Sequence, residues 1–174
     1  MIDFYSEWLM PFIEYVSTIR KSEALYEWGL PIVFGIIVYL LYNGTLNPAN
    51  NYLGFIENVL AILIGFSIAA IAVITTGSSK NVEELKKRKL KDEHDFLFEL
   101  DEDGKELNLY QLLIIQLTFA IGIEIFALIY NLIGQFFVTG TYLQLFFALD
   151  IIFVTWAILL TFRGMTNIFL VVVK

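Results

Sequence analysis

Three carboxyl side chains lie inside stretches of sequence that are otherwise almost entirely apolar: Glu57, Glu124 and Asp150. An unpaired carboxylate near the centre of a bilayer costs on the order of 3 kcal/mol on insertion scales, so such a residue faces the inside of a helix bundle or water. A carboxyl group in that setting binds a cation or proton, or it hydrogen-bonds a neighbouring helix. These acids are therefore the first candidates for chemistry in this chain.

Glu124 interrupts an apolar run that extends from about residue 109 to 133, and two interpretations of it are open. In the first, it binds or relays a cation or proton with Gln116 and Asn131 as polar neighbours, and subunit symmetry repeats it as an acidic ring. In the second, it is protonated because burial disfavours the charged form, and it hydrogen-bonds Asn58, Gln116 or Thr118 and so helps to join helices. The second interpretation is the one we favour.

Glu57 and Asp150 lie only a few residues from the ends of their apolar stretches. A carboxyl group at that depth can reach the membrane interface, and we favour this interpretation of both residues over a role in binding a cation or proton. Arg163 is the single basic residue within an apolar stretch. It lies too far along its helix from Asp150 for direct pairing, since a helix rises about 1.5 Å per residue.

Four membrane-spanning helices must position these side chains. The chain has 174 residues, of which 58% are hydrophobic, and a mean hydropathy of +0.72, well above the values of soluble domains. Four stretches reach the roughly 20 apolar residues that a bilayer core requires: 25–43, 53–74, 109–134 and 145–172. We expect an all-α integral membrane protein with one domain over residues 1–174. Pro31 lies early in the first stretch, where a helix tolerates proline.

The polar and small residues of the last two stretches recur at helical spacing. In 109–134 they share one face, and in 145–172 they share another. The residues are Gln116, Ala120, Glu124, Ala127 and Asn131 on the first, and Asp150, Ala157, Thr161 and Gly164 on the second. Polar residues within a span are expected to face the bundle interior or water.

The stretch 53–74 carries a stripe of small residues in which Ala61, Gly65 and Ala69 are spaced by four. This small-xxx-small pattern lets two helices approach closely. It favours homo-oligomerisation, although the spacing fits packing within one subunit equally well. Asn58 lies on the same stripe and is a candidate for an intramembrane polar site.

The distribution of basic residues predicts the topology. All eleven Lys and Arg residues fall on one side, whereas the connections around 43–51 and 135–143 carry no charge. Lys and Arg concentrate in cytoplasmic segments, so both termini and the loop 75–108 are expected in the cytoplasm. The protein is expected in the inner membrane of a prokaryote as a multi-pass protein in contact with lipid.

Two cytoplasmic segments are candidates for protein contacts. Segment 1–24 is an amphipathic helix with an acidic polar face, which favours packing against protein, with a plain interfacial anchor as the alternative. The loop carries a basic cluster next to an acidic run that would repel phosphate, so we expect a cytosolic protein partner and no direct nucleic acid. The cluster comprises Lys86, Lys87, Arg88, Lys89 and Lys91.

Enzymatic activity is not expected. The chain has no cysteine, its single histidine is His94 in the charged loop, and no residues have metal-ligand spacing. Ser67 has no intramembrane histidine to activate it. No cofactor is expected.

The overall layout is an amphipathic N-terminus, two helical hairpins, a charged loop between them and a short inner tail. This layout resembles the small four-helix membrane subunits of bacterial anti-phage defence systems, most nearly that of the Kiwa system. The resemblance implies an oligomeric membrane subunit that works with a cytosolic partner and responds to infection at the envelope. The expected function is therefore an oligomeric sensor or scaffold, with a cation or proton channel or a membrane-permeabilising effector as alternatives.

Overall fold

The computed structural model describes residues 10–16, 19, 21–41, 49–77, 80–87, 108–137 and 142–173. Residues 10–16 form a short helix, and five further helices follow: α2 (Lys21–Leu41), α3 (Ala49–Thr76), α4 (Lys80–Lys87), α5 (Leu109–Phe137) and α6 (Leu143–Val173). The expected all-α fold is confirmed.

Four of these helices are long and apolar enough to cross a membrane. The qualifying segments are Glu23–Leu41, Tyr52–Thr76, Leu109–Phe136 and Leu143–Phe169. Their number agrees with the sequence, and the protein is a multi-pass membrane protein by the length and composition of these helices. Because α2 begins at Lys21, Pro31 lies inside the helix and not in its first turn as expected. Proline has no N–H, so the carbonyl of Glu27 loses its intrahelical donor.

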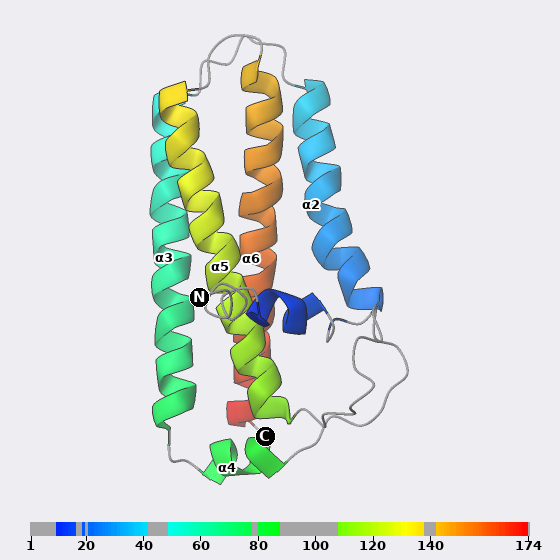
Figure 1. Cartoon of the computed structure of the whole chain (residues 1–174), viewed down its shortest axis with the longest axis vertical. Helices are drawn as coiled ribbons and strands as arrows, with labels where there is room; N and C mark the ends of the chain where they lie inside the picture. Colours follow the sequence, from blue (N-terminus) through cyan, green and yellow to red (C-terminus); the bar gives the residue numbers. More distant parts are fainter. Residues whose placement is uncertain are drawn as a thin grey trace, which may run out of the picture.

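The long helices run side by side, with α4 at one end of the bundle (Figure 1). Helix α5 packs against α3 and α6, and α2 packs against α6. The main core lies where α3, α5 and α6 meet, and the side chains of Leu60, Ala120 and Ala157 there are completely buried. Alanine on both α5 and α6 allows these two helices to approach closely.

Glycines mark two further close approaches in the bundle. A Cβ on Gly134 of α5 would lie 1.8 Å from the ring of Phe146 on α6, and a Cβ on Gly35 of α2 would lie 2.4 Å from Ile152 of α6. Both positions require glycine because a side chain would overlap its neighbour. They hold α6 against α5 and α2 at the end of the bundle away from α4.

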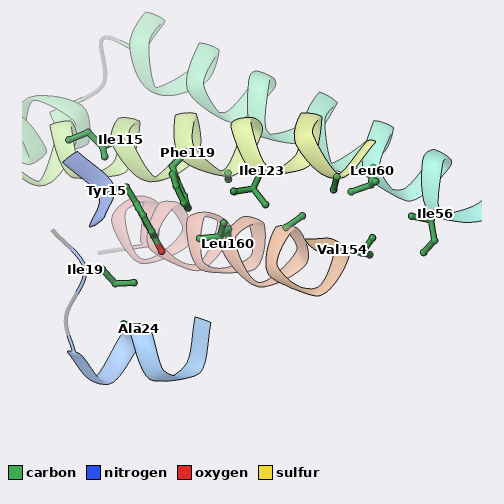
Figure 2. Close-up of a cluster of buried hydrophobic side chains, with 13 residues drawn as sticks. Tyr15, Ile19, Ala24, Ile56, Leu60, Ile115, Phe119, Ile123, Val154 and Leu160 are labelled. Atoms are coloured by element: carbon green, nitrogen blue, oxygen red, sulfur yellow. The ribbon is translucent and has the colours of Figure 1, made fainter. Parts of the chain in front are cut away.

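The short helix of residues 10–16 packs on the bundle. Tyr15 stacks on Phe119 of α5, with ring centroids 3.8 Å apart, and Phe12 meets the same ring edge-on at 5.1 Å. Figure 2 shows Tyr15 beside Phe119 and Leu160, with Ile19 and Ala24 leading to α2. This part of the amphipathic segment 1–24 therefore contacts protein, whereas residues 1–9 lie outside the described part of the chain.

The loop 75–108 is described at its two ends. Helix α4 carries Lys86 and Lys87 in its last turn, and both side chains are exposed. The ammonium group of Lys86 lies 4.9 Å from the ring centroid of Tyr110, a cation–π contact that joins α4 to the start of α5. The rest of the basic cluster, Arg88, Lys89 and Lys91, lies outside the described residues.

Candidate functional site

Buried polar side chains form separate groups along the bundle. The central group, which we call the mid-bundle site, consists of Ser67 on α3, Glu124 on α5 and Thr161 on α6. Their exposed fractions are 0%, 0% and 1%, so water outside the bundle does not reach them. A different helix contributes each residue, and the site therefore exists only when α3, α5 and α6 are packed together.

The hydrogen bonds of the mid-bundle site converge on one carboxyl oxygen. Ser67 Oγ lies 3.0 Å from Glu124 Oε1, and Thr161 Oγ1 lies 2.5 Å from the same atom. Thr161 Oγ1 also lies 2.8 Å from the carbonyl oxygen of Ala157, one turn earlier on α6. Glu124 Oε2 is buried and has no hydrogen-bond partner within the described part of the chain.

The partners of Glu124 differ from those expected. Asn58 is exposed on the far side of α3, and the amide oxygen of Gln116 instead accepts a 2.8 Å hydrogen bond from Asn167 Nδ2 on α6. Thr118 is half-buried and forms no hydrogen bond with Glu124 in the described structure. Helical spacing correctly places Glu124 on an inward face, but its partners are the hydroxyl groups of Ser67 and Thr161 on the neighbouring helices and not the residues we expected.

A second polar pair lies towards the end of the bundle away from α4. Asn131 Nδ2 lies 3.2 and 3.3 Å from the two carboxyl oxygens of Asp150, and both residues are completely buried. We expected Asp150 to reach the membrane interface, but it turns inward because Asn131 donates to it. The Tyr52 hydroxyl of α3 is buried beside the Asp150 carboxyl group, and Asn131 Oδ1 is buried without a hydrogen-bond partner among the described residues.

Glu57 occupies the third expected acidic position. It is half-buried on α3 and accepts a hydrogen bond from Gln135 Nε2 near the end of α5. The six candidate polar residues thus do not form one site. Glu124, Gln116 and Asn131 lie on the inward face of α5 with separate partners, Asp150 pairs with Asn131, and Glu57 and Asn58 lie apart from them.

A charged cluster that the sequence did not predict joins α2 to α6. Arg163 forms ion pairs with Glu23, at 2.5 Å, and with Glu27, and the hydroxyl of Tyr15 donates to the other oxygen of Glu27. Glu27 is only 6% exposed. The sequence does contain a signal for this cluster. Glu23 and Glu27 are spaced by four and so share a helix face, and the span Glu23–Leu41 contains no Lys or Arg to pair with them.

The small-residue stripe of α3 faces outward. Ala61, Gly65 and Ala69 are exposed, and a Cβ on Gly65 meets no other described atom within 4 Å. Asn58 lies on the same exposed face and makes no hydrogen bond with any described residue. The stripe therefore does not pack against another helix of the same described chain.

Among the described residues, no group of three His, Cys, Asp or Glu side chains is placed to hold a metal ion. The mid-bundle site offers hydroxyl and carboxyl groups, which donate and accept hydrogen bonds and can pass a proton between them. No family model, curated protein or solved structure matches this chain.

Proposed function

We propose that this protein is a non-enzymatic membrane scaffold or sensor subunit that self-associates through the outer face of α3 and presents its α4 end to a cytosolic protein. The observation that carries the proposal is Asn58, a side-chain amide exposed on the small-residue face of a membrane-spanning helix. An amide facing hydrocarbon without a partner is costly, and a second copy of α3 supplies both a donor and an acceptor.

The surroundings of Asn58 fit a helix–helix contact. Ala61, Gly65 and Ala69 follow it on the same exposed face, so two α3 helices can approach until their backbones touch. The large apolar side chains of Phe55 and Ile62 are exposed beside this face and border the contact. Self-association through this face leaves the interior of each bundle unchanged.

The α4 end supports the docking part of the proposal. Lys86 and Lys87 are exposed there, and the distribution of Lys and Arg in the sequence favours the cytoplasm for this end. A partner with an acidic surface is complementary to these side chains. The anti-phage role rests on the layout that this chain shares with the Kiwa membrane subunit, and we propose it on that ground alone.

The position of Glu124 weighs against a channel along the axis of an oligomer. A ring of carboxyl groups requires each Glu124 to face the symmetry axis. Here the side chain is completely buried within one subunit and is held by two hydroxyl groups of that subunit. The structure therefore favours the scaffold over the channel.

Native mass spectrometry of the protein in mild detergent tests self-association. We expect a defined oligomer for the unchanged protein and monomers for Gly65→Val, because the added side chain separates the α3 helices. Gly29→Val on α2 is the matched control, since a Cβ there also meets nothing within 4 Å among the described residues. A monomeric unchanged protein, or equal dissociation by both variants, contradicts the proposal.

Docking is tested by reversing the charges of Lys86 and Lys87 to Glu in the same preparation. A stoichiometric cytosolic partner should be lost while the oligomer remains, because these side chains lie outside the bundle. Retention of the partner by the charge-reversed protein would exclude α4 as its docking surface. Gly65→Val with the partner still bound would separate docking from self-association.

A further inference from the structure

Thr161 has one hydroxyl hydrogen but two oxygen atoms within hydrogen-bond distance. The carbonyl oxygen of Ala157 lies at 2.8 Å and Glu124 Oε1 lies at 2.5 Å. Both are acceptors if Glu124 is a carboxylate, and one of the two contacts then has no hydrogen between its oxygens. A separation of 2.5 Å between two oxygens requires a hydrogen between them.

We propose that Glu124, Ser67 and Thr161 form a buried proton-binding site in which Glu124 carries the proton on Oε1 and donates it to Thr161 Oγ1. The Thr161 hydroxyl then donates to the carbonyl of Ala157, which is a usual bond for threonine within a helix. Ser67 donates to the remaining lone pair of Oε1. Each of the three contacts now has one hydrogen.

The second carboxyl oxygen supports the same assignment. Glu124 Oε2 is buried without a hydrogen-bond partner in the described structure. In a carboxylate this atom would carry about half of the negative charge, and burying an unpaired charge costs far more than burying a neutral carbonyl. The neutral acid therefore leaves the less costly atom unpaired.

The charged groups around the site do not favour a carboxylate. Arg163 follows Thr161 by two residues on α6, but it is paired with both Glu23 and Glu27, so this cluster contributes no net positive charge. On the elements packed around the site, the other ionisable groups within the described part of the chain are acids and tyrosines. Those groups are Glu57 and Tyr52 on α3, Tyr110 and Tyr130 on α5, Asp150 on α6, and Glu14 and Tyr15 on the N-terminal helix.

The distances along the helices limit the influence of these ionisable groups on Glu124. Asp150 precedes Thr161 by eleven residues, which is about 16 Å along α6, and Glu57 precedes Ser67 by ten residues, which is about 15 Å along α3. No described cation is placed to hold Glu124 in the charged form. Release of its proton would leave a negative charge between α3, α5 and α6, so occupancy of the site and packing of these helices are linked. This assignment does not depend on the oligomer or on a cytosolic partner.

Infrared spectroscopy of the purified full-length protein tests the assignment directly. A protonated carboxyl group has a C=O stretching band that a carboxylate lacks. We expect the spectrum of the unchanged protein minus that of Glu124→Gln to contain one such band, corresponding to one proton per chain. A difference spectrum that contains only carboxylate bands would overturn the proposal.

Two further variants test the assignment of the C=O band in a protein that keeps Glu124. Thr161→Val removes the acceptor of the proton, so the C=O band should shift, and Glu57→Gln, the matched acid outside the site, should leave it in place. A shift in Glu57→Gln but not in Thr161→Val would assign the band elsewhere.

Discussion

The bundle buries a glutamate at two of its helix junctions, and it stabilises them in opposite ways. At the junction of α2 with α6, Glu27 is paired with Arg163 and also accepts from Tyr15. At the junction of α3, α5 and α6, Glu124 meets the neutral hydroxyl groups of Ser67 and Thr161. Burial alone does not decide between the two arrangements, because both glutamates are almost inaccessible, at 6% and 0% exposed.

The difference follows from position along the helices. Glu27 lies near the start of α2, where the long side chain of Arg163 reaches it and remains 20% exposed. Glu124 lies near the middle of α5, where a cation would have to be buried at full cost. Glu27, near the end of its span, is therefore paired with a partner charge, whereas Glu124, in the middle of α5, meets hydroxyl groups and on our proposal carries a proton. The variants below test this contrast.

Removal of Arg163 should have the largest effect. Arg163→Ala leaves Glu27 buried beside Glu23 without a cation, and breaking a buried ion pair in this way costs about 3–5 kcal/mol. We expect a loss of that size in the free energy of unfolding, measured in mixed detergent and denaturing-detergent micelles. The double variant Arg163→Met with Glu27→Gln should recover most of the loss, because it removes the charge together with its partner. Equal losses for the single and double variants would show that packing, and not charge, holds α2 to α6.

The mid-bundle site should respond less. Glu124→Ala removes two hydrogen bonds but leaves no charge behind, and side-chain hydrogen bonds between membrane helices are worth about 0.5–2 kcal/mol. We expect Glu124→Ala to lower the free energy of unfolding by about 1–2 kcal/mol in the same assay. Glu124→Gln should recover most of it, because its amide can donate to Thr161 Oγ1 as the protonated acid does. A loss in Glu124→Gln as large as that in Arg163→Ala would mean that Glu124 is charged.

The faces of the helices could be predicted from the sequence, but the partners across them could not. Spacing places Gln116, Glu124 and Asn131 on one side of α5, and all three are buried, at 5% exposed or less. Spacing does not identify the neighbouring helix, and the sequence alone therefore does not pair Ser67 with Glu124. Ser67 follows Gly65 by two residues, which turns it about 200° away from the small-residue stripe and into the bundle.

Glu23 and Glu27 illustrate a different limit. The sequence shows Arg163 as the single cation within an apolar stretch, and its distance from Asp150 along α6 excludes that pairing. Its true partners precede the uncharged part of the first span, and the expected helix began at 25, after Glu23. The structure starts α2 at Lys21, so both glutamates lie on the helix one turn apart. An error of four residues at a helix end was enough to hide the cluster.

The smallest change tests how the N-terminal helix joins the two junctions. Tyr15 contacts both, because its ring stacks on Phe119 of α5 while its hydroxyl donates to Glu27 of α2. Tyr15→Phe keeps the ring and removes one hydrogen bond from a glutamate that retains Arg163. We expect a loss of about 1 kcal/mol in the free energy of unfolding.

Tyr15→Ala is the matched comparison, since it removes the stacked ring as well. It should cost about 3 kcal/mol or more, as other large-to-small changes of buried aromatic residues do. Amide hydrogen exchange across residues 10–16 should then become faster in Tyr15→Ala but stay nearly unchanged in Tyr15→Phe. If both variants release the segment equally, the hydroxyl bond to Glu27 holds it in place. The ion-paired junction would then position the N-terminal helix, and the stacking on Phe119 would not be needed to hold it there.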